Sequence, residues 1–195
     1  MKKKQEDLIE AVMKVAEDDS PRVKEGVDKF IENVFDKGML PKDALGIEDN
    51  DTEAMYAQAY QMYNMGKYQD ARAIFASLTL IDQLDPRFLF GHAACSHMME
   101  EYQSAADIYM QQAIISPEDP VAYYHAADCY LKLGDPFSAT VALKLVIKRS
   151  GENPKFATIK ERSEMTVKNI EEKLQAEDLG TPKEIKKPKG EEKKT

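Results

Sequence analysis

Residues 53–75 of this chain read EAMYAQAYQMYNMGKYQDARAIF, and the fold is predicted from the pattern in this segment. It holds two short amphipathic segments separated by Gly66, a residue that suits the turn between two helices. A small residue, Ala59, lies in the first segment, another, Ala71, lies in the second, and the aromatic Phe75 comes late in the second. Two such segments joined by one glycine predict a pair of antiparallel helices that cross closely at the two alanines.

The same pattern recurs with a period of 34 residues. The aligned sets are Ala59, Ala93 and Ala127; Ala71, Ala105 and Ala139; Phe75, Tyr109 and Leu143; and Gly66, Glu100 and Gly134. Asp-Pro or Asn-Pro pairs recur at the same spacing, and each marks a helix start because Asp and Asn cap helices and Pro fits the first helical position. These pairs are Asp85-Pro86, Asp119-Pro120 and Asn153-Pro154. The repeats predict an all-α stack of three helix pairs over residues 52–85, 86–119 and 120–153.

Further segments flank the repeats within residues 1–50 and 155–195. The N-terminal part predicts two amphipathic helices, the second capped by Ser20 and ending at Gly38. Their apolar stripes are Leu8, Ile9, Val12, Val15 and Ala16, and then Val23, Val27, Phe30, Ile31, Val34 and Phe35. Residues 155–177 predict a capping helix with Ile159, Val167, Ile170 and Leu174 on one side. Residues 178–195 are densely charged and almost without apolar side chains, so they predict a disordered tail.

Composition narrows the classes of function. The chain has 195 residues, a net charge of -8 and a mean hydropathy of -0.55, and the excess of acidic residues lies in its body rather than in its termini. An acidic body argues against nucleic-acid binding, which needs basic faces. No apolar run approaches the roughly 18 residues that cross a membrane, and no secretory signal follows the first lysines, so we expect a cytoplasmic protein without membrane insertion.

Catalytic and metal motifs are weak in this sequence. It has no phosphate loop, no dinucleotide fingerprint and no HExxH motif, so we expect neither an enzyme nor a cofactor. Its two cysteines, Cys95 and Cys129, are repeat equivalents on helices that are not nearest neighbours, which makes a shared zinc ion or a disulfide between them improbable. The prediction is therefore a binding protein without a metal site.

A second regular line of residues runs along the first helix of each repeat. Met55, Ala59 and Met62 form the packing stripe of the first repeat, and a tyrosine line lies one residue further round. With its equivalents in the other repeats, this line predicts a groove on the inner surface of the stack. The candidate groove residues are Tyr56, Tyr60, Tyr63, Asn64, Phe90, Ala94, His97, Tyr124, Asp128 and Leu131. The alternative interpretation is that the tyrosines fill the core or pack on the N-terminal helices.

The 34-residue period, with its small residues, turn glycine and late aromatic residue, resembles the tetratricopeptide repeat (TPR). Glu100 in place of a turn glycine and Pro136 in place of a turn tyrosine depart from the family pattern. The resemblance implies a right-handed superhelix. The basic clamp of the heat-shock co-chaperones is absent, since its places are held by Tyr56, Tyr60, Gly91, Val121 and His125.

Residues 20–175 also resemble the class II chaperones of bacterial type III secretion. The resemblance rests on the N-terminal helices, on residues 53–75, and on the stretches LDPRFLFGHAACSHMMEEYQSAADIYMQQAI (84–114) and DPVAYYHAADCYLKLGD (119–135). It implies a chaperone whose groove holds an extended segment of a secreted translocator, and members of the family often form homodimers through their N-terminal helices. The alternative is a TPR scaffold that joins folded proteins in a complex.

Overall fold

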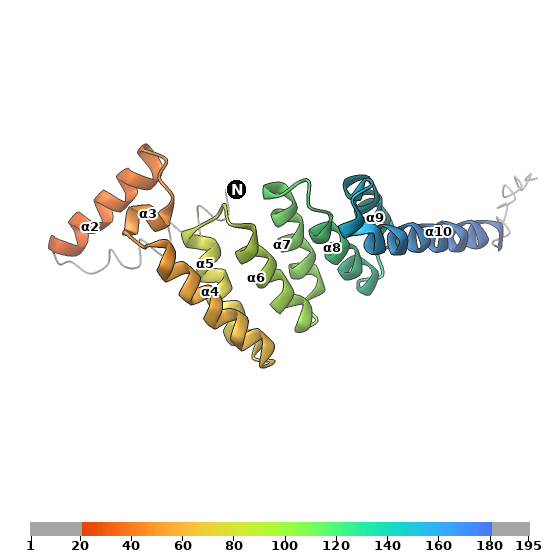
Figure 1. The fold of residues 1–195 in the computed structure, drawn as a ribbon, viewed down its shortest axis with the longest axis horizontal. Helices are drawn as coiled ribbons and strands as arrows, with labels where there is room; N and C mark the ends of the chain where they lie inside the picture. Colours follow the sequence, from red (N-terminus) through yellow and green to blue (C-terminus); the bar gives the residue numbers. More distant parts are fainter. Residues whose placement is uncertain (1–20, 181–195) are drawn as a thin grey trace, which may run out of the picture.

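The computed structural model describes residues 21–180, and all the regular elements within that range are helical. They are α2 (Pro21–Ile31), the π-helix η1 (Glu32–Asp36), α3 (Pro41–Leu45), α4 (Asp49–Asn64), α5 (Tyr68–Ile81), α6 (Pro86–Met98), α7 (Tyr102–Ile115), α8 (Pro120–Lys132), α9 (Pro136–Ser150), the 3-10 helix η2 (Pro154–Phe156) and α10 (Ala157–Gly180). Figure 1 shows them following one another along an elongated molecule, with α2 at one end and α10 at the other.

Three helix pairs, α4/α5, α6/α7 and α8/α9, form the predicted TPR stack, a right-handed superhelix. The predicted helix starts are confirmed by their caps. The Asp85 carboxylate accepts a hydrogen bond from the backbone N–H of Arg87 at 2.9 Å, and Asp119 accepts one from Val121 at 3.0 Å. Asn153 caps η2 in the same way.

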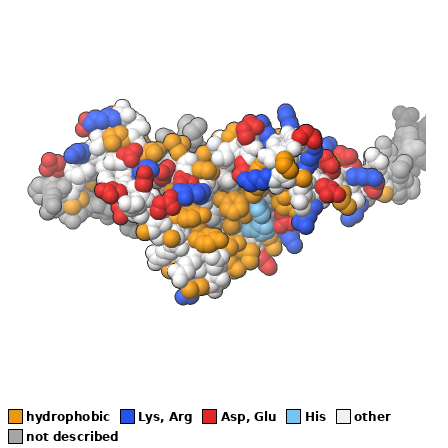
Figure 2. All heavy atoms as spheres, viewed as in Figure 1, with side chains coloured by type: hydrophobic (Ala, Val, Ile, Leu, Met, Phe, Trp, Pro, Cys, Tyr) orange, Lys and Arg blue, Asp and Glu red, His pale blue; other side chains and the backbone are white. Residues whose placement is uncertain are grey.

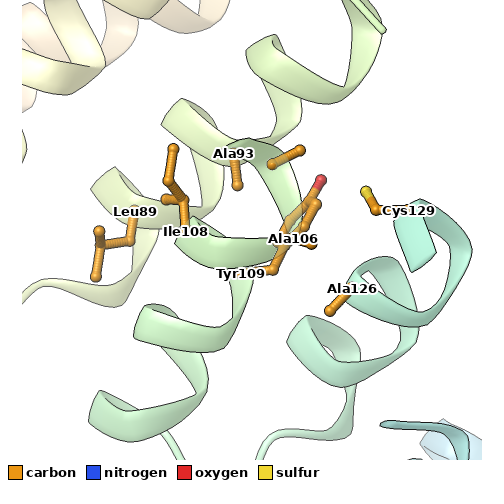
Figure 3. Close-up of a cluster of buried hydrophobic side chains, with 8 residues drawn as sticks. Leu89, Ala93, Ala106, Ile108, Tyr109, Ala126 and Cys129 are labelled. Atoms are coloured by element: carbon orange, nitrogen blue, oxygen red, sulfur yellow. The ribbon is translucent and has the colours of Figure 1, made fainter. Parts of the chain in front are cut away.

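The core lies between the helices of successive pairs. Ala71, Ala105 and Ala139 are fully buried, as expected for residues that let two helices approach closely. The late aromatic positions are also core positions, since Phe75 and Tyr109 are both 2% exposed. Figure 3 shows the side chain of Tyr109 lying between its own helix and the α8 residues Ala126 and Cys129.

The turn between α6 and α7 contains the one described non-glycine residue with a positive φ angle. Glu100 has φ of 61°, close to the 76° of Gly66 and the 72° of Gly134 in the other repeats. A side chain in this left-handed region costs about 1 kcal/mol or more. We expect Glu100→Gly to raise the free energy of unfolding by about 1 kcal/mol in chemical denaturation. A decrease would mean that Glu100 makes contacts that outweigh this backbone strain.

The N-terminal region differs from the prediction in detail. The helix predicted to end at Gly38 is divided into α2 and η1, and the short helix α3 follows where no element was expected. Lys42 of α3 attaches this region to the repeats, since its Nζ lies 2.8 Å from Asp82 at the end of α5 and 3.0 Å from Asp49 at the start of α4. The helix predicted around Leu8–Ala16 lies outside the described residues.

The final helix is longer than predicted and closes the stack with only part of its length. Val167 and Ile170 are buried against Ala127, Ala142 and Leu143. Leu174, expected on the same packing side, is 48% exposed, because α10 continues past the body of the repeats, as Figure 1 shows. Residues 178–180, predicted as the start of the tail, belong to α10, and the rest of that tail lies outside the described residues.

Candidate functional site

Aromatic side chains from the first helices of successive repeats gather on one face of the stack. Figure 2 shows hydrophobic side chains spread over the middle of the molecule around α6, with histidine side chains beside them. Most of the candidate groove residues fall into two groups. One group lies between repeats one and two, and the other lies between repeats two and three.

The first group is built around Tyr56 of α4. Its ring contacts those of Phe75 and Phe88 and lies nearly parallel to that of Tyr60, with centroids 6.4 Å apart. Tyr56 is partly buried, whereas Tyr60 is 54% exposed. Tyr63 packs on Tyr68, within its own repeat. Tyr56 and Tyr63 therefore fit the core interpretation, because both pack against buried residues. Tyr60 fits the groove interpretation, because its ring is exposed to solvent.

Arg87 covers the Tyr56 end of this group. Its guanidinium lies 5.1 Å from the Tyr56 ring centroid, and its Nη2 atom lies 2.6 Å from both Glu53 and Asp85. Arg87 and Glu53 occupy the same repeat position one period apart. This pair was not among the predicted site residues. Opposite charges at equivalent positions of adjacent repeats are a sequence signal that points to it.

The second group is built around His125 of α8, which is partly buried. Its imidazole stacks on Tyr109 with centroids 5.2 Å apart and an interplanar angle of 20°. Phe90 and Tyr124 meet the imidazole edge-on, at 5.4 Å and 5.9 Å. Phe90 and Tyr124 are predicted groove residues, whereas His125 is not among them. His125 is the ring that joins them.

A polar contact between His97 and Asp128 crosses between repeats two and three. The Nε2 atom of His97, on α6, lies 3.0 Å from Oδ2 of Asp128, on α8. His97 also contacts Tyr109 and His125 through its ring, at 6.3 Å and 6.5 Å between centroids. Two of the predicted groove residues are thus brought together. The Asp128 side chain is 47% exposed, so it remains open to a ligand.

The remaining candidates complete this face without joining either group. Leu131 is 39% exposed near the end of α8. Ala94 is partly buried and Asn64 is exposed. No ring contact links Tyr63 to the second group among the described residues, so the predicted aromatic line is discontinuous.

The cysteines and carboxylates of the described region do not assemble a metal site. No group of three or more His, Cys, Asp or Glu side chains between residues 21 and 180 has the geometry to hold a metal ion. Burial raises the pKa of Cys95 to about 11 and that of Cys129 to about 12. Both thiols are protonated at neutral pH, which makes them poor metal ligands and weak nucleophiles.

Comparison with family models agrees with this architecture. One tetratricopeptide repeat model matches residues 52–83 and 86–119, and a second matches residues 121–152. These ranges coincide closely with the three predicted repeats. The chain is therefore a tetratricopeptide-repeat protein.

Curated relatives narrow the class. Low calcium response locus protein H of Yersinia pseudotuberculosis is 31% identical over 131 residues, which cover 67% of this chain and 78% of the relative. Chaperone protein SicA of Salmonella typhimurium is 27% identical over 126 residues, 65% of this chain and 76% of the relative. The chain belongs to the family of type III secretion chaperones represented by these proteins, and its function is that of a chaperone.

Solved structures add what such chaperones bind. The Yersinia enterocolitica chaperone SycD, in complex with a peptide of the translocator YopD, matches with a TM-score of 0.63 and 30% identity over 66% of this chain and 98% of the other. PcrH, in complex with the chaperone-binding region of PopD, matches with a TM-score of 0.63 and 26% identity over 66% and 97%. SycD has also been solved as an alternative dimer.

Proposed function

We propose that this chain holds an extended segment of a secreted translocator in the groove formed by α4, α6 and α8, and so keeps that client available for export. The carrying observation is the partly exposed aromatic face, in which Tyr60, Phe90 and Tyr124 come from three successive first helices. Phenol rings are apolar with a polar edge, which suits a surface that is wet when empty and dry when occupied. The SycD and PcrH complexes with translocator peptides support the choice of client.

The polar groups of this face suit an extended backbone. Asn64 is exposed at the end of α4, and the Asp128 side chain is 47% exposed on α8. With the tyrosine hydroxyls, they would satisfy peptide N–H and C=O groups of a client that forms no secondary structure of its own. Holding of this kind needs no catalytic step, so we assign the chain no enzymatic activity. Between residues 21 and 180 the structure contains no helix able to cross a membrane. We place the chaperone in the bacterial cytoplasm, where its clients await export.

Tyr60 is the sharpest test of the groove, because its exposed ring contributes little to the core. Aromatic anchors at interfaces commonly contribute about 2 kcal/mol each, so we expect Tyr60→Ala to weaken binding at least about tenfold. The measurement is isothermal titration with the YopD peptide bound by SycD and with the PopD region bound by PcrH. The melting temperature of the variant should stay close to that of the parent chain.

Phe137→Ala provides a matched control. Phe137 is 78% exposed, but it lies on α9, the second helix of its repeat. We expect this variant to keep both affinity and stability. Retained affinity in Tyr60→Ala, or in a triple variant that also replaces Tyr56 and Tyr63, would move the binding site elsewhere. Failure of the chain to raise the soluble yield of any co-expressed translocator would favour the scaffold alternative.

A further inference from the structure

His125 occupies a repeat position that holds only a small residue in the other two repeats. Its equivalents one and two periods earlier are Gly91 and Ala57. At Gly91 the ring of Phe75 fills the space that a side chain would take, since an added Cβ atom would lie 2.5 Å from it. In the third repeat, His125 instead stacks on Tyr109, the equivalent of Phe75. The third repeat therefore has an aromatic ring at a position where the other two repeats have none.

This extra ring contacts two groove residues. Phe90 of α6 contacts both Tyr109 and His125, and Tyr124 of α8 contacts His125. The imidazole lies between an outer pair of rings that the client would touch and an inner ring that is only 2% exposed. A movement of His125 would therefore remove a ring contact from both Phe90 and Tyr124.

The groups that face His125 have unequal effects on its charge. His97 faces it from α6, Tyr109 from α7, and Tyr124 and Asp128 lie on its own helix. Burial lowers the pKa of His125 below the ordinary 6.5, and nearby His97 lowers it further, while Asp128 opposes both effects. The neutral imidazole is the form that this stack accommodates, because a charged ring would need water that Tyr109 and Phe90 exclude.

We propose that neutral His125 is a positioning residue of the client groove, and that its protonation in mildly acidic solution releases Phe90 and Tyr124 and weakens client binding. This inference rests on the proposed function. Two movements would offset the cost of a buried imidazolium. The ring can leave the stack for water, or it can compete with His97 for the Asp128 carboxylate. Both change the surface offered to the client, and both reverse when the pH rises.

The first measurement is the dissociation constant of the complex with the YopD peptide between about pH 7.5 and about pH 5.5. In the parent chain we expect binding to weaken by up to about fivefold at the acid end of this interval, because a difference of about one pKa unit between bound and free protein gives its full tenfold effect only below both pKa values. His125→Phe keeps a ring over Tyr109 but cannot be protonated, so its affinity should change much less with pH than that of the parent chain. His92→Gln removes a third histidine, also on α6, and should keep the parent profile.

The second measurement needs no client. Nuclear magnetic resonance of the full free chain follows the His125 imidazole together with the ring signals of Phe90 and Tyr124. We expect all three to change with one midpoint below pH 6.5, and the changes at Phe90 and Tyr124 to disappear in His125→Phe.

The outcomes separate the two proposals. If the YopD peptide binds at neutral pH and His125→Phe keeps the parent pH profile, the inference is overturned while the proposed function stands. If the peptide does not bind at any pH, the choice of client fails, and the ring signals alone decide the role of His125. Ring signals of Phe90 and Tyr124 that ignore the titration of His125 overturn the inference in either case.

Discussion

Truncation of Tyr109 to alanine is expected to lower the free energy of unfolding by about 3–5 kcal/mol, the cost of removing a buried aromatic ring. Tyr109 is 2% exposed and contacts rings from both neighbouring first helices, Phe90 and His97 on α6 and His125 on α8. Its loss would leave a cavity between two repeats. A loss of this size is a large part of the total stability of an ordinary domain. Urea denaturation followed by circular dichroism measures it.

Tyr109→Phe separates the ring from the hydroxyl group. The equivalent position of the first repeat is already a phenylalanine, Phe75, so the repeat geometry accepts this ring. We expect the variant to retain most of the parent stability. Tyr60→Ala removes the same side chain from a half-exposed position and should cost much less. Equal losses for Tyr60→Ala and Tyr109→Ala would show that the distinction between groove and core drawn here is wrong.

The fold was readable in the sequence because each of its signals is local or periodic. Small residues, caps and late aromatic residues recur every 34 residues, so each repeat reports the same geometry again. Even Glu100, which breaks the glycine pattern, adopts the positive φ angle that this pattern requires. The division of the N-terminal helix into α2 and η1 was not readable, since no proline or glycine marks Ile31 or Glu32.

The candidate site was only partly predictable, because helical periodicity gives the face of a helix but not the depth of a side chain. Tyr56, Tyr60 and Tyr63 share one line in the sequence, yet Tyr60 alone of the three is more than half exposed. Their depth depends on what the neighbouring helix supplies. Phe88 and Arg87 cover Tyr56, and Tyr68 packs on Tyr63. Such contacts between helices have no signature within one helix.

Gly91 shows how one position in the repeat controls the packing of two helices. Replacement by alanine would place a Cβ atom 2.5 Å from Cε1 of Phe75, whose side chain is only 2% exposed, so the ring or the helix must shift. Alanine is the better helix former by about 1 kcal/mol, but overpacking of a core contact typically costs about 1–3 kcal/mol. We expect Gly91→Ala to lower the free energy of unfolding within that range.

Two further variants identify the clash with Phe75 as the cause. At Gly26, a helical glycine of α2, an added Cβ atom meets nothing within 4 Å, so Gly26→Ala should leave stability unchanged or raise it by up to about 1 kcal/mol. Phe75→Leu introduces the residue that the third repeat carries at this position, Leu143, and should make Gly91→Ala less costly. A double-mutant cycle in urea denaturation measures this coupling. Strictly additive effects of Gly91→Ala and Phe75→Leu would contradict the packing of α5 on α6. They would also remove the explanation for a small residue at Gly91, the position equivalent to His125.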